Sequence, residues 1–275
     1  MANKRSIYGI GGVAVGVLAG LLEWNLYEQV EPSRLIWMLA LQGGVGLLLG
    51  VGLYRLQQDI ADRRLRTTYG TLNALARAVA AKDNETNGHS RRVVQYSLLI
   101  GRRMELEADT LQQLEWGALL HDIGKIAVPD AVLQKSGPLS DEEWGMMKQH
   151  PQIGYQMVQD LDFLDSGLDV VLYHHERFDG GGYPQRLQGE SVPLLARIFA
   201  IADTFDAITS DRPYRKAQSA EHAREEIRRH VGRQFCPRCV EAFFAIPIEE
   251  LEAVKRESQA AEPEIVTLLE IKQIS

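Results

Sequence analysis

Two adjacent histidines followed by a glycine-rich run form the most distinctive stretch of this sequence. The stretch reads His174-His175-Glu176-Arg177-Phe178-Asp179-Gly180-Gly181-Gly182-Tyr183-Pro184. Imidazole is the commonest protein ligand for metals and titrates near neutral pH, so the pair suits metal binding or acid–base chemistry. The glycines let the backbone approach a ligand closely, and the Tyr-Pro step favours a stiff turn. A histidine pair alone is weak evidence, because most histidines are surface or hydrogen-bonded core residues.

The rest of the chain strengthens the case for a metal site. Five of the seven histidines fall at ends or junctions of predicted helices, and two aspartates accompany them. A carboxylate such as Asp203, within an apolar helical pattern, is costly unless it is paired or binds a metal. Helix-borne histidine and carboxylate ligands build dinuclear sites in bundles, so we expect two metal ions here. The candidate ligands are His89, His121, Asp122, His150, His174, His175 and Asp203.

Helical periodicity and end signals position these residues. Apolar residues recur at helical spacing and predict a helix over 111–123, which ends in the run His121-Asp122-Ile123-Gly124-Lys125 with Gly124 as its C-cap. Ser140 and Glu143 have the spacing of a capping box, which predicts the start of another helix.

The following elements are also predicted to be helical. His150 ends the helix that the capping box opens, and Pro151 can begin a further helix over 152–161. Residues 167–173 lead into the histidine pair, and Pro193 opens the helix that carries Asp203. Strand signals are almost absent, so we expect an all-α fold, a helical bundle.

The first 54 residues contain two uncharged apolar runs, 6–22 and 35–54. Each approaches the roughly 20 apolar residues that a membrane helix needs. Basic residues flank the two runs and the connector between them is acidic, so both ends are expected in the cytoplasm. We therefore predict two transmembrane helices, in contact with membrane lipids and joined by a short external loop, over 1–54. A cleaved signal peptide is the alternative for the first run, but no small-residue cleavage site follows it.

The sequence after the membrane runs divides into three parts. We predict a connecting helix over 55–82, a soluble domain over 83–246 and a C-terminal tail of mixed charge over 247–275. Pairing of the membrane helices and the connecting helix would give a homodimer. The net charge of −7 argues against bulk attraction to nucleic acid.

The motifs together resemble a known enzyme family. His121-Asp122 matches the signature of the HD phosphohydrolases, and with the 174–184 stretch the chain is similar to the HD-GYP branch of bacterial cyclic di-GMP phosphodiesterases. The resemblance covers about 71–246 and includes Lys82-Asp83, Gly88-His89-Ser90 and His150-Pro151. It implies an HD-type bundle that hydrolyses cyclic di-GMP to pGpG, GMP or both, in bacterial second-messenger signalling. The location implied is the inner membrane, with the catalytic domain in the cytoplasm.

The resemblance also implies roles for individual residues. All seven candidate ligands match family ligands, with Asp122 bridging the two metals and Glu85 available for a third. A histidine and carboxylate set without thiolate favours iron or manganese over zinc. Residues expected at the substrate are Lys125, against the scissile phosphate, with Gly182, Tyr183, Arg212 and Arg215. The glycine loop is linked in the family to contacts with partner domains, such as diguanylate cyclases.

Two other functions fit the same sequence. One is a module that binds cyclic di-GMP or docks a partner without turnover, and the other is an HD hydrolase of another nucleotide or cyclic dinucleotide. Degenerate family members usually lack a ligand, and the complete set here favours catalysis. The intact glycine loop and the pair Arg212 and Arg215 favour cyclic di-GMP.

Cys236 and Cys239 depart from the family pattern, which usually has an aspartate where Cys236 stands. Two cysteines are too few for a disulfide framework, or for a zinc site without a partner chain. We interpret the change as a neutral substitution at a helix start, with a redox role as the alternative.

Overall fold

The computed structural model describes residues 31–83, 88–211 and 215–260 of the 275-residue chain. The first apolar run, 6–22, lies outside these ranges, as do Glu85, Arg212 and the end of the expected tail, 261–275. The chain divides into two compact units, Met1–Arg66 and Thr67–Ser275. All candidate site residues that the structure describes belong to the second unit.

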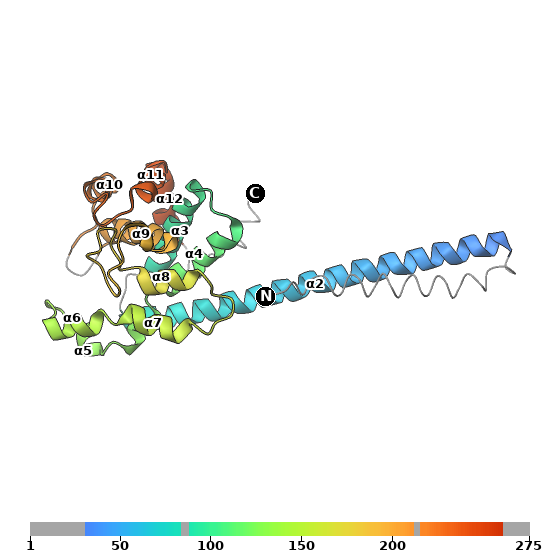
Figure 1. Cartoon of the computed structure of the whole chain (residues 1–275), viewed down its shortest axis with the longest axis horizontal. Coiled ribbons are helices and arrows are strands. Elements are labelled where there is room, and N and C mark those ends of the chain that lie inside the picture. The colour runs from blue at the N-terminus through green and yellow to red at the C-terminus, as the bar shows by residue number, and fades with distance from the viewer. Residues whose placement is uncertain (1–30, 84–87, 212–214, 261–275) are drawn as a thin grey trace. The chain divides into compact units, whose positions relative to one another are not determined.

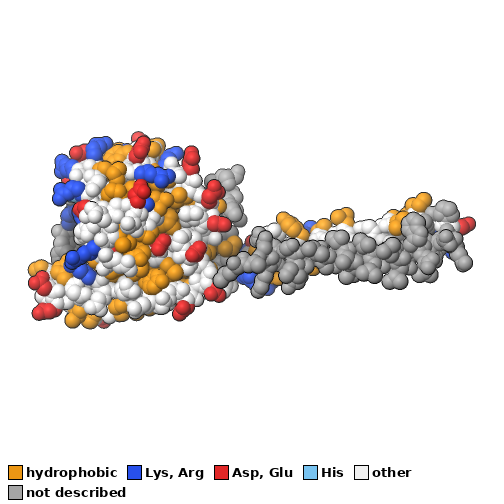
Figure 2. All heavy atoms as spheres, in the orientation of Figure 1, with side chains coloured by type: hydrophobic (Ala, Val, Ile, Leu, Met, Phe, Trp, Pro, Cys, Tyr) orange, Lys and Arg blue, Asp and Glu red, His pale blue; other side chains and the backbone are white. Residues whose placement is uncertain are grey.

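A single long helix, α2 (Pro32–Asp83), contains both the expected second span and the expected connecting helix (Figure 1). Its stretch Leu39–Lys82 is long and apolar enough to cross a membrane, by length and composition alone. The apolar side chains of its first part are exposed, and Figure 2 shows several of them in orange along the helix. The described residues thus contain one candidate span, and the other predicted span lies outside them.

Four helices form the centre of the second unit: α3 (His89–Arg103), α4 (Ala108–Leu120), α8 (Gly167–Tyr173) and α9 (Leu194–Thr209). Helices α3 and α8 each pack against both α4 and α9. The core between them includes fully buried Val93, Leu114, Val170 and Phe199. Each such side chain stabilises the fold by roughly 1.5–3 kcal/mol through removal of apolar surface from water. This burial fixes the helix ends at which the candidate ligands lie.

The remaining helices surround this centre. Helix α7 (His150–Val158) packs on α8 and on the short 3-10 helix η2 (Ile123–Ala127). The short elements are α5 (Asp130–Leu133), α6 (Asp141–Met147) and η3 (Gly189–Ser191). Near the C-terminus follow α10 (Ala220–Arg229), α11 (Pro237–Phe244) and α12 (Ile248–Ala260). The described residues contain no strand, only two isolated bridges, which confirms the all-α prediction for them.

Local signals were wrong at two predicted helix boundaries and correct at others, such as Pro193, which is the N-cap of α9. The capping box of Ser140 and Glu143 is present at the start of α6, which confirms that prediction. Helix α4 ends at Leu120 with His121 as its C-cap, and Gly124 lies in η2. A Cβ atom on Gly124 would clash with the carbonyl oxygen of His150 and lie 2.6 Å from the nitrogen of Gly154. Glycine is therefore required by the contact of η2 with α7, not as a helix cap.

The second correction concerns His150. The sequence placed it at the end of one helix, but it is the first residue of α7, and α6 already ends at Met147. The backbone of Gln149, between the two helices, remains in the right-handed helical region. The connection from α6 to α7 is therefore only two residues long. The imidazole therefore starts from the beginning of α7, on the side that faces α8.

Candidate metal centre

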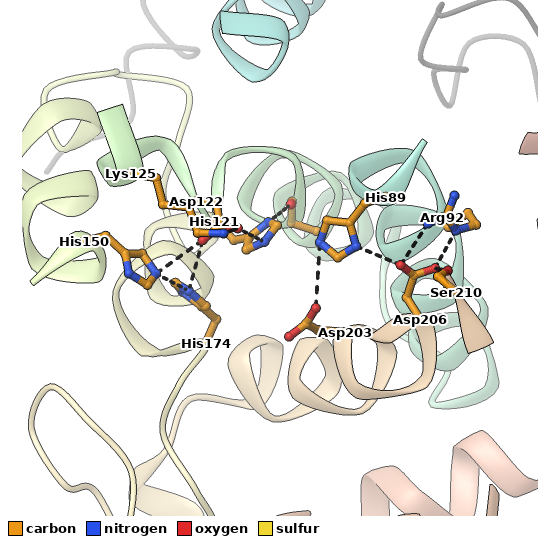
Figure 3. Close-up of polar contacts among 11 residues, drawn as sticks. His89, Arg92, His121, Asp122, Lys125, His150, His174, Asp203, Asp206 and Ser210 are labelled. Atoms are coloured by element: carbon orange, nitrogen blue, oxygen red, sulfur yellow. Dashed lines mark hydrogen bonds and ion pairs between the residues drawn. The ribbon is translucent and has the colours of Figure 1, made fainter. Parts of the chain in front are cut away.

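Two clusters of potential metal ligands lie at the helix ends of the second unit. The first comprises His89, His121 and Asp122, and the second comprises His150, His174 and His175. Within each cluster, one ligand atom from every residue lies within 4.8 Å of the others. Figure 3 shows the labelled members pointing toward a common space between α3, α4, α8 and α9. The sequence-predicted histidines are thus brought together from positions far apart in the chain.

The Asp122 carboxylate lies between the two clusters. Its Oδ2 atom is 2.9 Å from Nε2 of His121, and its Oδ1 atom is 3.3 Å from Nε2 of His150 and 3.9 Å from Nε2 of His174. The two oxygens of one side chain therefore face different clusters. Lys125 adds a positive charge, with its Nζ atom 2.7 Å from Oδ2.

Three histidines are oriented by the backbone through their Nδ1 atoms. Nδ1 lies 2.8 Å from the Ala118 oxygen in His121 and 2.7 Å from the Met147 oxygen in His150. In His174 it lies 3.0 Å from the Val171 oxygen. A carbonyl only accepts, so each Nδ1 must carry a proton, and the Nε2 atom presents a lone pair whenever the ring is neutral. Fixing the tautomer in this way is how proteins commonly prepare histidine for a metal.

This tautomer assignment provides a test of whether a cation fits. The Nε2 atoms of His150 and His174 are 3.0 Å apart, and both present lone pairs because both Nδ1 atoms donate to carbonyls. Two lone pairs cannot hydrogen-bond to each other, whereas one cation can accept both. Buried, neutral imidazoles beside a carboxylate are also the donor set that divalent transition metals prefer. The residues present therefore fit a metal centre.

The electrostatics of the site point the same way. Burial and the neighbouring His175 hold the pKa of His174 well below its ordinary value. Burial, with His150 nearby, lowers the pKa of His175 to about 3. Burial opposes ionisation of Asp122, but His121 and Lys125 outweigh it and hold the pKa of that carboxyl well below its usual range. Burial opposes ionisation of His121, but Asp122 outweighs it and raises the pKa of that imidazole, so His121 must release a proton when a metal binds. Neutral His174 and His175 and an ionised Asp122 already have the protonation states that metal binding requires.

His89 is oriented by a carboxylate that the sequence did not single out. Its Nδ1 atom lies 2.8 Å from Oδ2 of Asp206, while its Nε2 atom faces Oδ1 of Asp203 at 3.8 Å (Figure 3). Asp206 is 1% exposed, and the guanidinium of Arg92 hydrogen-bonds both of its oxygens. The only available signal was the spacing of Asp203 and Asp206, three residues apart and so on neighbouring positions of one helix face.

An open cavity of about 770 Å³ lies beside the second cluster. Its wall includes His174, His175, Asp203, Gly182 and Tyr183. The Tyr183 ring stacks on the His175 ring, with centroids 4.7 Å apart. A Cβ atom on Gly182 would lie 2.5 Å from the His175 oxygen and 2.6 Å from the Glu176 Cα atom, so the loop folds back closely on the histidine pair. The glycine loop thus forms part of the cavity wall.

The cavity wall also contains residues that sequence reasoning missed. Trp144 of α6 is 45% exposed and lines the cavity with Lys148. The Lys148 Nζ atom lies 5.8 Å from the ring centroids of both Trp144 and Tyr183. These residues have no motif of their own, because their position depends on how α6 packs against the rest. Arg215 is exposed, donates a hydrogen bond to the Ala207 oxygen and is not among the lining residues.

The profile of the HD domain matches residues 73–238, which is more than half of the chain. This chain belongs to the HD domain family. The match spans all the ligands of both clusters and the cavity wall described above.

Curated relatives within this family are similar over the same region. A cyclic di-GMP phosphodiesterase response regulator of Xanthomonas campestris pv. campestris is 43% identical over 176 residues, 63% of this chain and 47% of the relative. A 3′3′-cGAMP-specific phosphodiesterase of Vibrio cholerae is 37% identical over 172 residues, 62% of this chain and 33% of the relative. The chain therefore spans less than half the length of either relative.

A solved structure shares the fold. A cyclic GMP-AMP-specific phosphodiesterase of V. cholerae superposes with a TM-score of 0.53 at 21% sequence identity, over 68% of this chain and 52% of that chain. This likeness agrees with the HD-type bundle expected from the sequence.

Proposed function

We propose that this protein is a metal-dependent phosphodiesterase that hydrolyses cyclic di-GMP in bacterial second-messenger signalling. The observation that carries the proposal is the position of the Asp122 carboxylate, with one oxygen toward each histidine cluster, beside a cavity of about 770 Å³. That volume is in the range of ordinary small-molecule sites. The name of the relative that is 43% identical supports the choice of substrate.

The metal content belongs to this proposal. Two divalent ions, iron or manganese, would be held by the two clusters and Asp203, with Asp122 shared between them and Glu85 available for a third. When bound, such ions lower the pKa of a water molecule and withdraw charge from phosphate oxygens.

The residues of the chain prepare the site for this chemistry. The backbone carbonyls at Ala118, Met147 and Val171 keep the proton on Nδ1, so that each Nε2 remains a donor of electrons. Lys125, beside Asp122, carries positive charge where negative charge develops on the phosphate. Five of the six cluster residues are buried, and the low local dielectric strengthens each of these interactions.

The cavity wall would bind the rest of the substrate. Trp144 offers an exposed aromatic face on which a base can stack. Gly182 keeps the backbone close to the histidine pair, and Tyr183 stacks beside it. Arg212 and Arg215 would bind the phosphate groups of the substrate. The products would be pGpG, GMP or both.

The remaining sequence expectations also stand as proposals. The anchor would be two spans over 1–54 in the inner membrane, with 55–82 as connector, 83–246 as the cytoplasmic catalytic domain and 247–275 as a tail. The exposed apolar stretch of α2 supports one of these spans. Contact of the membrane helices would give a homodimer, and the glycine loop would meet signalling partners such as diguanylate cyclases.

The test uses the full chain in detergent, loaded with Fe²⁺ or Mn²⁺ and incubated with cyclic di-GMP. Chromatography should detect pGpG or GMP, and Asp122→Ala should abolish turnover because the two clusters lose their shared carboxylate. Asp160→Ala, an exposed aspartate outside the cavity, is the matched control and should keep full activity. Binding of cyclic di-GMP without any product would instead identify a non-catalytic receptor.

Cyclic GMP-AMP is a second candidate substrate, because a relative specific for it is 37% identical to this chain. Parallel assays with both cyclic dinucleotides decide between them. A specificity constant at least about tenfold higher for cyclic GMP-AMP, a difference of about 1.4 kcal/mol in transition-state binding, would replace cyclic di-GMP as the substrate.

A further inference from the structure

Cys236 and Cys239 lie together at the start of α11. Cys236 is the N-cap residue and Cys239 lies in the first turn of the helix. Both are unbridged thiols, 3% and 0% exposed respectively. Pro237 and Arg238, which separate them, are exposed, so the pair lies directly below the surface at this helix end. The spacing places the two cysteines within one helical turn. This is the Cys-x-x-Cys arrangement in which an intramolecular disulfide can form.

Arg197 of α9 is the charged neighbour of this pair. Its Nη1 atom donates to the Cys236 sulfur at 3.3 Å. Its Nε atom is buried with no hydrogen-bond partner, and within the described residues the guanidinium forms no ion pair with a carboxylate. A partly buried cation is costly without a nearby anion. The thiolate form of Cys236 supplies that anion.

The ionisation of the two thiols agrees with this geometry. Hydrogen bonding from Cys239, with Arg197 adding to it, lowers the pKa of Cys236 to about 5. The pKa of Cys239 is raised, because it donates to Cys236 and is buried. Cys239 and Arg197 are the titratable groups that act on the Cys236 sulfur, and Arg197 and Arg238 act on Cys239. The pair thus combines a thiolate nucleophile with an adjacent thiol.

We propose that Cys236 and Cys239 form a reversible oxidation site, in which a peroxide converts the two thiols into an intramolecular disulfide. The Cys236 thiolate attacks one peroxide oxygen, so that an S–O bond forms, the O–O bond breaks and the departing oxygen leaves as water after taking a proton. The Cys239 sulfur then attacks the Cys236 sulfenic acid, and the S–O oxygen leaves with the Cys239 proton as a second water. Two thiols and one hydrogen peroxide thereby give one disulfide and two waters.

The site is connected to the cavity wall by backbone hydrogen bonds. The segment before Cys236 accepts from the glycine loop: Phe178 N donates to Gln234 O at 3.1 Å, and Asp179 N donates to Arg233 O at 2.7 Å. Gln234 also lines the cavity and accepts from Arg177 through its side chain at 3.3 Å. Disulfide formation consumes the thiolate and leaves Arg197 without its anion. Oxidation is therefore expected to loosen the segment that holds the glycine loop.

The chemical test treats the full chain with hydrogen peroxide, blocks remaining thiols with iodoacetamide and digests it with trypsin without reductant. Trypsin cuts after Arg233, Arg238 and Lys255, so the two cysteines fall in separate peptides, 234–238 and 239–255. The proposal predicts that the two peptides stay linked, with the loss of two hydrogen atoms, and separate after dithiothreitol. Separate peptides with both cysteines alkylated would overturn it.

Variants of the two cysteines separate the steps. Cys239→Ser cannot close the ring, so peroxide should leave a sulfenic acid on Cys236 that dimedone traps. Cys236→Asp keeps an anion for Arg197 and cannot be oxidised, whereas Cys236→Ser supplies no anion. We expect the thermal midpoint of the aspartate variant to match that of the reduced wild type and to exceed that of the serine variant. Equal midpoints for aspartate and serine would refute the anionic role.

Hydrogen exchange measures whether oxidation of the two cysteines affects the cavity wall. The amides of Phe178 and Asp179 should exchange about tenfold faster in the oxidised than in the reduced chain, because each would lose a hydrogen bond of typical strength. Cys236→Asp treated with peroxide should show no such change, because it keeps an anion for Arg197 and cannot be oxidised. Unchanged exchange in the oxidised wild type would overturn the coupling. None of these readouts depends on substrate turnover, so they stand apart from the proposed activity.

Discussion

The Nδ1 atom of His89 lies 2.8 Å from the Oδ2 atom of Asp206, a residue 117 positions away in the sequence. Helix α3 supplies the histidine and α9 the carboxylate, and both are almost completely buried. Arg92, one turn after His89, hydrogen-bonds the same carboxylate. Asp206 therefore fixes the ring orientation of one candidate ligand.

Replacing Asp206 should weaken the metal centre at His89. Asp206→Ala removes the acceptor that orients the ring, and losses of roughly 10–100-fold in metal affinity or activity are typical of such partners. Asp206→Asn, which keeps the shape and one acceptor oxygen, should lose less. Metal titration of both variants, followed by activity at saturating metal, measures the effect. A histidine ring that binds metal equally well in Asp206→Ala would show that the carboxylate has only a structural role.

Removing the metal should destabilise the second unit, because the Nε2 atoms of His150 and His174 are left as facing lone pairs 3.0 Å apart. At about 100-fold excess of metal over its Kd, binding adds about 2.7 kcal/mol, which corresponds to a shift of roughly 5–10 °C in the thermal midpoint. Scanning fluorimetry with a chelator and then with Mn²⁺ measures the shift. His150→Ala should lose it, whereas His222→Ala, at an exposed position, should keep it. A chelator without any effect on the wild type would contradict a bound metal.

Gly182→Ala should disrupt the loop that folds over the histidine pair. The added methyl group would lie 2.5 Å from the His175 oxygen and close to the backbone of Glu176, so the loop must move. Overpacking of this kind typically costs about 1–3 kcal/mol, and the displaced histidines should also lower activity. Gly70→Ala is the control, because that exposed helical glycine has no neighbour within 4 Å and alanine should stabilise the helix slightly. Chemical denaturation should show opposite changes in stability for the two substitutions, and turnover should fall only in Gly182→Ala.

The ion pair between Arg177 and Asp179 should stabilise the glycine loop at every pH at which the Asp179 carboxyl is ionised. The Arg177 guanidinium and the Gly181 amide lower the pKa of Asp179 to about 2, below the value of about 3.9 expected in the unfolded chain. A lowered folded-state pKa means that the contribution is present above about pH 4 and disappears as the pH falls toward 2. The difference in thermal midpoint between wild type and Asp179→Asn should therefore shrink over that interval. A difference that stays constant with pH would rule out the ionised carboxylate as its source.

Local sequence signals predicted the helical class and several helix starts. The period of 3.6 gave the all-α fold of the described residues, and Ser140 with Glu143 gave the start of α6, because both signals act over a few neighbouring residues. The helix end at Gly124 was predicted wrongly. Glycine is needed there because a side chain would clash with the backbone of His150, a contact that no local signal reveals. The seven candidate ligands were identified from their residue types and their places in the predicted helices, and the family resemblance then implied their roles. Two of the expected site residues, Glu85 and Arg212, lie outside the described residues.

The sequence by itself determined which residue types could bind a metal and that helices would carry them, because composition and periodicity are local properties. Only the tertiary structure decided which atoms face one another: the proton on each Nδ1, the two oxygens of Asp122 toward different clusters, and Asp206 behind His89. It also decided that Cys236 meets Arg197 from another helix, which turns an apparently neutral substitution into a candidate oxidation site. These relations arise from the packing of α3, α4, α9 and α11, whose contacts join residues far apart in the chain.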